Sequence, residues 1–267
     1  MYIHDLNPLL IKIGLIEIRW YSLAYIFGII LGWWLGKKLL RFKIKENYNH
    51  LSIKIFDDFI SQIIIAIILG GRLGYVIFYN LNYYLKNPLD IIKIWEGGMS
   101  FHGALIGIIF STYIFAKNKK IDHLLLLDIL ACVSPIGLFF GRIANFVNAE
   151  LYGKPAEVFW SVIFPTIDNL PRHPSQIYEA LLEGIFLFVI INFVMLKKEI
   201  KNGICASLFL ILYGFFRIFA EQFREPDIHI GYFFNFFSMG SILSILMVIC
   251  GFIIFKKINN ESIKRNF

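Results

Sequence analysis

Long apolar segments recur along this sequence, and they restrict its possible folds more than any other feature. An α-helix rises about 1.5 Å per residue, so roughly 20 mostly apolar residues are needed to cross the ~30 Å hydrocarbon core of a bilayer. Segments of about this length lie at residues 20–36, 58–79, 97–116, 123–141, 176–196, 203–221 and 233–255. We therefore predict an all-α polytopic membrane protein with about seven transmembrane helices.

The composition also favours a membrane protein over a soluble one. Of the 267 residues, 58% are hydrophobic and 17% are charged, whereas soluble domains average about 45–50% and about 25%. No repeat and no low-complexity linker divides the chain, so we interpret residues 1–267 as a single integral membrane domain. The first residues lack the order of basic, apolar and small residues that marks a cleavable signal peptide, and we expect none.

The basic residues predict the orientation of the chain. If the segments alternate in direction, lysine-rich stretches at 37–54, 117–120, 197–201 and 256–265 fall on the same side. The positive-inside rule makes this side cytoplasmic, so we expect the N-terminus outside and the C-terminus in the cytoplasm. Because membrane topology explains most of the net charge of +7, we predict no nucleic-acid partner.

The connection between the fourth and fifth segments, residues 142–175, is expected on the outer side. It contains the stretch VFWSVIFP, which is rich in strand-forming residues. We therefore predict a small structured feature on the outer face between these two segments.

Several charged side chains fall inside the apolar segments or at their ends. A charge at the centre of a bilayer costs about 2.5–3.5 kcal/mol on insertion scales, so such groups usually face a protein interior or a wet cavity. Groups near a segment end can instead reach the membrane interface. The charged residues in question are Arg72, Asp128, Glu179, Glu183, Arg217 and Glu221. The glycines that precede Arg72, Gly70 and Gly71, allow close packing of helices.

The sixth segment ends in the polar stretch YGFFRIFAEQFREPD. On a helix, one face of this stretch carries Tyr213, Arg217, Glu221 and Arg224. Pro226 is expected to end the helix. One interpretation is a self-contained polar ladder in which Arg217 pairs with Glu221. The other is that Arg217 meets an anion, and a phosphate suits the planar fork of a guanidinium group.

The fourth segment is followed by a second polar stretch, GRIANFVNAELYGKP. If the helix continues past Gly141, Arg142 and Asn145 lie on one face. The asparagines can cap the helix or turn the chain, and Gly153 is a candidate for a positive-φ position. The alternative is a simple loop cap, with Arg142 extending its side chain to the membrane interface.

The third segment opens with EGGMSFHGALIG, which places His102 about one turn into the helix. A lone histidine on an apolar face is usually structural. The neighbouring glycines, however, permit the close backbone approach that a substrate crevice needs. An imidazole in such a crevice can act as a general base near neutral pH.

The fifth segment is preceded by LPRHPSQIYEA, which predicts a helix start. Pro174 is expected at the first helical position, where its fixed φ is already helical. Gln176 is expected to serve the opening turn of the same helix.

The sequence contains no pattern that predicts a metal or cofactor site. Its six histidines include no HxxxH pair, and no GxSxG motif or phosphate-binding loop is present. The three cysteines, Cys132, Cys205 and Cys250, lie inside apolar runs and are interpreted as small hydrophobic residues. Any chemistry must then be performed by Arg, His, Tyr, Asn and carboxylate side chains.

Five of these stretches, taken in order, resemble the prolipoprotein diacylglyceryl transferase family. They are GGRLGYVIFYN, WEGGMSFHGALIG, GRIANFVNAELYG, RHPSQIYEA and YGFFRIFAEQFREPD. The likeness runs nearly from end to end, from RWYSLAY at 19–25 to NFFSMGSILS at 235–244. The chain departs from the family pattern at Ala144 and Ala149, where the family typically or commonly has glycine.

The resemblance implies a transferase of the bacterial inner membrane with its active site toward the outer face. The reaction it implies moves the diacylglyceryl group of phosphatidylglycerol to the thiol of the lipobox cysteine in a prolipoprotein signal peptide. The products are a thioether and glycerol phosphate, and the reaction is the first step of lipoprotein maturation. The resemblance implies no metal and no organic cofactor; the expected partners are the lipid substrate, the signal peptide and the membrane lipid.

The resemblance and the chemistry together suggest roles for individual residues. Because a thiolate is the nucleophile, a base must accept the thiol proton, and His102 is the candidate. Arg142 and Arg217 are expected to neutralise the leaving phosphate. Residues expected to line the site are Tyr21, Asn145, Glu150, Gly153, Tyr213, Glu221 and Arg224. Glu150 remains an alternative base or a partner for Arg142.

Two other functions fit the membrane composition. A transporter or channel would spread polar residues through the membrane depth and often shows an internal repeat. A non-catalytic lipid-binding protein would explain the arginines without explaining the His102 stretch.

Overall fold

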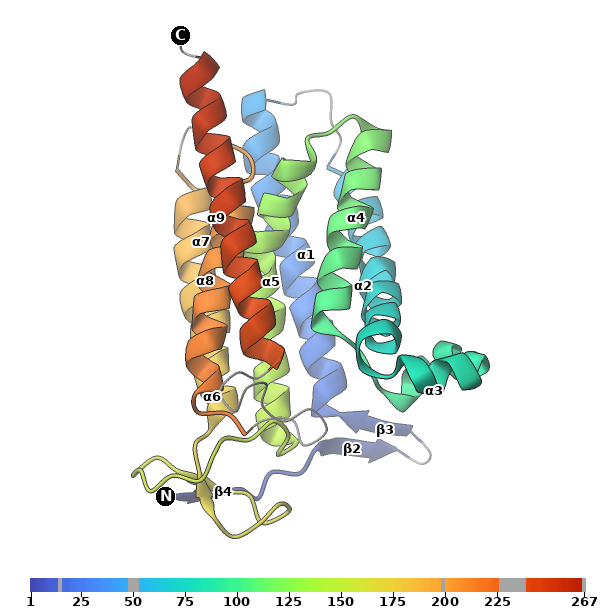
Figure 1. Ribbon diagram of the computed structural model, residues 1–267, viewed down its shortest axis with the longest axis vertical. Helices are drawn as coiled ribbons and strands as arrows, with labels where there is room; N and C mark the ends of the chain where they lie inside the picture. Colours follow the sequence, from blue (N-terminus) through green and yellow to red (C-terminus); the bar gives the residue numbers. More distant parts are fainter. Residues whose placement is uncertain (14–15, 48–52, 198–199, 226–238, 266–267) are drawn as a thin grey trace. The chain divides into compact units, whose positions relative to one another are not determined.

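The computed structural model describes residues 1–13, 16–47, 53–197, 200–225 and 239–265, and this part of the chain is mostly helical (Figure 1). The long helices are α1 (Trp20–Asn47), α2 (Ile55–Tyr79), α4 (Phe101–Lys119), α5 (His123–Val147), α8 (Ile204–Glu221) and α9 (Met239–Arg265). A further helical run consists of α6 (Ser175–Glu179), the π-helix η3 (Ala180–Phe186) and α7 (Leu187–Met195). Shorter helices are α3 (Leu81–Lys86), η1 (Pro88–Ile92) and η2 (Ile94–Glu96).

Within the described residues, six helical segments are long and apolar enough to cross a membrane. They are Trp20–Lys43, Ile55–Tyr79, His123–Val147, Ser175–Met195, Ile204–Glu221 and Gly240–Asn260. These segments support the predicted polytopic, largely helical architecture.

The predicted third segment, 97–116, forms the helix α4 but is not among the six. Its 19 residues begin at Phe101 and end with a basic last turn that contains Lys117 and Lys119. Part of the predicted last segment, 233–255, and the predicted helix stop at Pro226 lie outside the described residues.

The chain divides into two compact units. The first consists of Met1–Gly36 and Asp128–Phe267, and the second of Lys37–Leu127. Each unit is described by itself, and the prediction of a single membrane domain stays a prediction.

In the second unit, α2 and α4 pack through facing glycines. A Cβ atom added to Gly103 would collide with the carbonyl oxygen of Gly70 and lie 2.7 Å from the Cα of Gly74. A Cβ on Gly107 would lie 2.6 Å from the carbonyl oxygen of Ala66. The two backbones therefore approach more closely than any larger residue allows, as the small residues in the sequence suggested.

The buried Arg72 of α2 donates hydrogen bonds to main-chain carbonyls of the loop that precedes α4. Its Nε donates to the Ile91 carbonyl at 2.9 Å, and its Nη2 donates to the Asp90 carbonyl at 2.6 Å. Its Nη1 donates to the carbonyls of Gly97 and Gly98 at 2.5 and 3.3 Å. This arginine therefore orders the loop between α3 and α4.

In the first unit, the buried Asp128 of α5 caps the start of α8. Its two carboxylate oxygens accept hydrogen bonds from the backbone N–H groups of Gly203 at 2.6 Å and Ala206 at 2.7 Å. Free N–H groups at a helix start favour a negative charge. The interaction explains why a carboxylate is placed within an apolar segment, and it fixes α8 against α5.

The predicted structured feature between α5 and α6 is a small sheet. Strand β4 (Val162–Ile163) pairs in parallel with β1 (Tyr2–Ile3) and antiparallel with β5 (Pro171–Arg172). Its hydrophobic core contains Ala149, Val162 and Phe164, with Phe146 and Tyr152 packed against it.

The structure also contains a hairpin that the all-α prediction missed. Strands β2 (Leu9–Ile13) and β3 (Ile16–Arg19) pair antiparallel just before α1. Lys12 and Glu17 face each other across the hairpin and form an exposed ion pair at 2.9 Å. The alternation of apolar and polar residues in IKI, at the end of β2, and in IEIR is the local signal for these strands.

We expect Gly103→Ala to destabilise the protein because the new methyl group overlaps the backbone of α2. Overpacking of this kind costs roughly 1–3 kcal/mol, so the melting temperature of the purified protein in detergent should fall by roughly 2–10 °C. Gly137→Ala in α5 is the matched control, since a Cβ there meets no atom within 4 Å. Equal melting temperatures for the two variants would contradict the glycine contact.

Candidate functional site

The site is built from the ends of α5, α6 and α8. Helix α5 continues past Gly141 to Val147, so Arg142 and Asn145 lie in its final turns, as the sequence suggested for a continued helix. Arg217 lies in the last part of α8, four residues before the end of that helix at Glu221.

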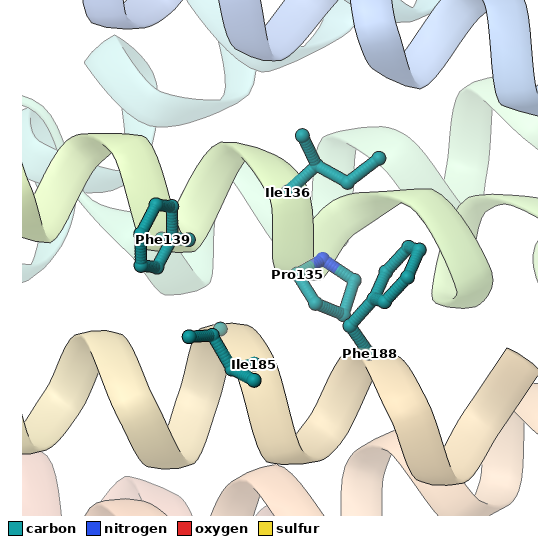
Figure 2. A pocket seen from close by; sticks show the side chains of 6 residues that line it. Pro135, Ile136, Phe139, Ile185 and Phe188 are labelled. Carbon is teal, nitrogen blue, oxygen red and sulfur yellow. The ribbon is translucent and has the colours of Figure 1, made fainter.

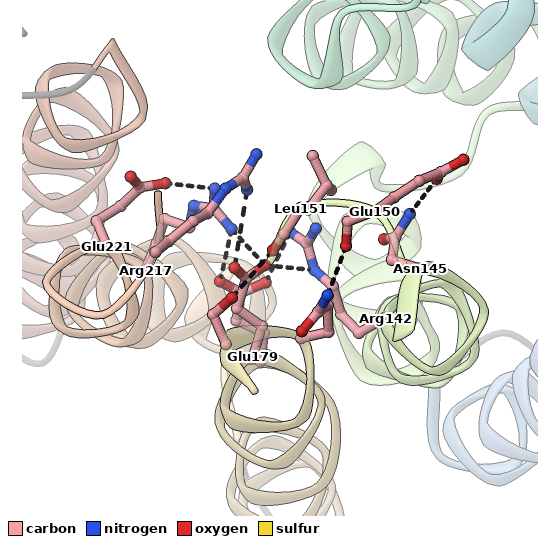
Figure 3. Close-up of polar contacts among 11 residues, drawn as sticks. Arg142, Asn145, Glu150, Leu151, Glu179, Arg217 and Glu221 are labelled. Carbon is pink, nitrogen blue, oxygen red and sulfur yellow. Dashed lines mark hydrogen bonds and ion pairs between the residues drawn. The ribbon is translucent and has the colours of Figure 1, made fainter. Parts of the chain in front are cut away.

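Two buried carboxylates join the arginines of α5 and α8 (Figure 3). The Oε2 atom of Glu179 lies 2.8 Å from Nε of Arg142 and 2.6 Å from Nη1 of Arg217. Glu183 lies 3.2 Å from Nη2 of Arg142 and 3.5 Å from Nη1 of Arg217. Glu179 and Glu183 are 1% and 0% exposed, so both need these cations as partners.

The pairing continues at the end of α8 and in the segment that follows it. Arg217 also forms a close ion pair with Glu221, one turn later on the same face. Arg224, three residues past the end of α8, approaches the Oε1 atom of Glu179 at 3.7 Å. We name the whole group the ionic cluster; its members are Arg142, Glu179, Glu183, Arg217, Glu221 and Arg224. The predicted Arg217–Glu221 ladder is therefore present, but it is one edge of a larger network.

A local distortion of the helical run α6–η3–α7 positions the two carboxylates next to the arginines. Glu179 ends α6, and Glu183 lies in the π-helix η3. Such π-helical turns are rare and frequently occur at functional sites. Next to Glu183, a Cβ on Gly184 would lie 2.7 Å from the Cβ of Phe139, so η3 and α5 are in close contact. This contact brings Glu183 within reach of Arg142.

The loop after α5 holds Glu150 above the end of the helix. Its carboxylate accepts hydrogen bonds from the side chains of Asn145 at 3.1 Å and Asn148 at 3.4 Å. Since Arg142 is paired with Glu179 and Glu183 instead, Glu150 is not the carboxylate that neutralises it here.

Two residues of this loop have left-handed backbone conformations, Ala149 with φ of 54° and Leu151 with φ of 56°. A residue other than glycine at such a position costs roughly 1–3 kcal/mol and persists only where its surroundings hold it. Those surroundings include Ser175 and Gln176, which donate to the carbonyls of Leu151 at 2.9 Å and Glu150 at 2.6 Å. A glycine at position 149, as the resemblance implies for the family, would adopt this positive φ without strain. Ala144 is an ordinary buried helix residue.

Gly153 does not supply the positive φ that we predicted; within the described chain the glycines with positive φ are Gly97, Gly98 and Gly203. Its role is steric instead. A Cβ there would collide with the carbonyl oxygen of His173 and lie 2.7 Å from that of Phe223.

The backbone around Gly153 joins two distant segments to the loop. Its N–H donates to the His173 carbonyl at 3.1 Å, and Gly153 forms a β-bridge with Arg224. Gly153 therefore allows the segment that carries Arg224 to lie against the loop after α5.

The start of α6 also differs from its prediction. Pro174 precedes the helix rather than occupying its first position, because its ψ of 67° is not helical. Gln176 does not serve its own opening turn but holds the Glu150 carbonyl, as described above.

Arg172 connects the loop after α5 to two further segments. Its guanidinium contacts Asp168 at 2.5 Å, the Gly153 carbonyl at 2.9 Å and Glu225 at 3.1 Å. This hydrogen-bonded cation lowers the pKa of the Asp168 carboxyl from its ordinary value. Arg172 also lies over the Tyr152 ring at 4.8 Å.

The remaining predicted residues lie in three places. Tyr21 is in the first turn of α1, and its hydroxyl lies 3.3 Å from that of Tyr25. Tyr213 is buried one turn before Arg217 and stacks on Phe209, with 5.6 Å between ring centroids.

His102 lies in the first turn of α4, in the second unit, with its ring edge-on to Phe101. The other predicted site residues belong to the first unit. The predicted role of His102 as a base therefore stays a prediction.

The sequence comparisons place the chain among known proteins. The model of the family described as prolipoprotein diacylglyceryl transferase matches residues 8–256. The chain belongs to this family. A relative from Rickettsia typhi is 47% identical over 98% of this chain and 100% of its own length. Relatives from Rickettsia akari and Ehrlichia canis are each 48% identical over 92% of this chain, and over 95% and 93% of their own lengths.

These three relatives are named phosphatidylglycerol–prolipoprotein diacylglyceryl transferases. The resemblance inferred from five motifs is thus confirmed at the level of the family. The match extends over nearly the whole chain and includes every element that contributes to the ionic cluster.

The sequence does not predict two members of the cluster, Glu179 and Glu183, as site residues. It identifies them only as charges within an apolar segment. Their spacing of four residues puts both on one helix face, and two unpaired carboxylates in an apolar helix require cations from other helices. That spacing was the available signal.

An apolar pocket of about 170 Å³ lies between α5 and the η3–α7 run (Figure 2). Its lining residues are Pro135, Ile136, Phe139, Gly184, Ile185 and Phe188. Phe139 precedes Arg142 by one turn, and Gly184 follows Glu183. The pocket thus begins next to two members of the ionic cluster.

We expect Glu183→Gln to destabilise the protein, because it leaves buried arginine charge without its partner. Breaking a buried ion pair costs about 3–5 kcal/mol, which corresponds to a fall in melting temperature of roughly 6–15 °C for a chain of this size. Glu17→Gln is the control, since it breaks an exposed pair with Lys12 and should shift the melting temperature by less than about 2 °C. Similar shifts for both variants would contradict the pairing of Glu183 with the arginines.

Proposed function

We propose that this protein transfers the diacylglyceryl group of phosphatidylglycerol to the thiol of the lipobox cysteine in bacterial prolipoproteins. The reaction forms a thioether, releases glycerol phosphate and is the first step of lipoprotein maturation. One observation carries the proposal: arginines from two apolar helices, Arg142 and Arg217, share one buried carboxylate in a chain of this family.

The leaving group explains why two arginines suit this reaction. The cysteine sulfur attacks the glyceryl carbon of the lipid, a C–S bond forms, and the C–O bond to the phosphate breaks. The phosphate changes from a diester to a monoester and gains negative charge near neutral pH. Preorganised guanidinium groups in a site with little water stabilise such developing charge strongly.

The arginines retain donors for a phosphate even in their paired state. Within the described part of the chain, Arg142 donates through Nε and Nη2, which leaves Nη1 available. Arg217 uses Nη1 and Nη2, which leaves Nε available. A bound phosphate can therefore join the cluster while Glu179 continues to position both arginines.

The thiol proton must go to a base, since the thiolate is the nucleophile. We propose His102 for this role and keep Glu150 as the alternative. Tyr21, Asn145, Gly153 and Tyr213 would line or shape the site, and Glu221 and Arg224 would orient its charges. We propose no metal and no organic cofactor for the reaction.

We propose seven membrane crossings, with α4 as the third. Its 19 residues give a length of about 28 Å, close to the ~30 Å hydrocarbon core. With seven crossings, the lysine-rich connections fall on the cytoplasmic side of the bacterial inner membrane. The N-terminus, the small sheet and the ionic cluster then lie toward the outer face, where exported prolipoproteins arrive.

The apolar pocket suits an acyl chain of the lipid substrate. All six of its lining residues are apolar, and it begins one helical turn from Arg142. A lipid whose phosphate contacts the ionic cluster can therefore place hydrocarbon against α5 and η3.

Mixing the purified protein with labelled phosphatidylglycerol and a lipobox peptide tests this function. We expect the diacylglyceryl label on the peptide, and Arg142→Gln or Arg217→Gln should slow its transfer by about 10²–10³-fold. Arg19→Gln is the control, because Arg19 lies in an exposed ion pair with Glu17, and it should keep the wild-type rate. A wild-type protein that binds the lipid without transferring it would support a lipid-binding or transport function instead.

A pH series of the same assay distinguishes the two candidate bases. A base must be deprotonated to accept the thiol proton, so the wild-type rate should fall as the pH is lowered. We expect His102→Asn to slow the reaction by about 10²-fold or more and to remove this dependence, whereas Glu150→Gln should retain it. The reverse result would assign the proton transfer to Glu150.

A further inference from the structure

Two buried side chains of α6 have acceptor atoms that receive no hydrogen bond from the described residues. Gln176 and Glu179 are one turn apart on the same helix face and are 0% and 1% exposed. The amide orientation of Gln176 is fixed, because its Nε2 donates to the Glu150 carbonyl at 2.6 Å and a carbonyl can only accept. Its Oε1 receives no hydrogen bond from the described residues.

Only one of the two carboxylate oxygens of Glu179 is hydrogen-bonded within the described chain. Its Oε2 binds Arg142 and Arg217 at 2.8 and 2.6 Å. Its Oε1 receives no hydrogen bond within the described chain, and Arg224 approaches it only to 3.7 Å, which exceeds hydrogen-bond length. Buried acceptors without donors are unfavourable, so both oxygens suit a ligand that brings donors of its own.

The headgroup of the proposed lipid carries such donors. Phosphatidylglycerol has one anionic phosphate and, beyond it, a glycerol with two free hydroxyl groups. The available donors of Arg142 and Arg217 suit the phosphate, which leaves the hydroxyls for acceptor atoms.

We propose that Oε1 of Gln176 and Oε1 of Glu179 accept hydrogen bonds from the headgroup glycerol hydroxyls of the lipid substrate. This inference rests on the proposed function and adds the basis of its headgroup specificity. Gln176 becomes a specificity-determining residue, while Glu179 both positions the arginines and contacts the headgroup. A site built to bind a hydroxyl discriminates against an analogue that lacks it, because its polar groups are then left unpaired.

The test compares phosphatidylglycerol with phosphatidylpropanol, which has the same phosphate but no headgroup hydroxyls. We measure kcat/KM for transfer to the lipobox peptide with both lipids, for the wild type and for Gln176→Met. The wild type should prefer phosphatidylglycerol by about tenfold or more, and Gln176→Met should reduce this preference by about three- to tenfold, as expected for one buried hydrogen bond.

Ser175→Ala is the matched control. Ser175 anchors the same loop through the Leu151 carbonyl at 2.9 Å, and its hydroxyl therefore has a hydrogen-bond partner, whereas Oε1 of Gln176 has none among the described residues. This variant should slow transfer from both lipids by the same factor and leave the preference unchanged, which separates loosening of the loop from loss of headgroup recognition.

Equal kcat/KM values of the wild type with the two lipids would by themselves overturn the inference. An unchanged preference in Gln176→Met would overturn the role of that residue, and in both cases the proposed transferase function would stand. A wild-type protein that reacts with neither lipid would overturn the proposed function and this inference with it.

Discussion

The shared carboxylate of Glu179 is the interaction on which the rest of the site depends. It binds Arg142 from α5 and Arg217 from α8 through one oxygen atom, and Glu183 repeats the connection one turn later. Burying these charges is costly, and a well-packed apolar core would often be as stable. The network is therefore better explained by function, since it holds two arginines together where neither helix alone could.

The surrounding structure limits the movement of this network. Asp128 fixes the start of α8 against α5, and Gly184 lets the π-helix approach Phe139 closely. At the other end, Gly153 brings the segment after α8 against the loop that carries Glu150. Preorganisation of this kind is what allows fixed charges to stabilise a transition state without reorganising during the reaction.

Much of this site could be predicted from local patterns. Helical spacing correctly placed Arg142 beside Asn145 and Arg217 beside Glu221, because both pairs lie within one helix. The partners of those arginines could not be assigned, since Glu179 and Glu183 meet them only through contacts between helices that are distant in sequence. Gly153 was misjudged for the same reason: its need for a small side chain comes from the carbonyls of other segments. The N-terminal hairpin was missed because the long apolar segments dominated the prediction.

A double-mutant cycle between Glu179 and Arg142 tests the central claim most directly. The measured quantity is kcat/KM for diacylglyceryl transfer by the wild type, Glu179→Gln, Arg142→Gln and the double variant. If Glu179 acts by positioning Arg142, the double variant loses much less than the product of the two single losses, with a coupling energy above about 1 kcal/mol. Losses that multiply independently, with coupling near zero, would contradict the account.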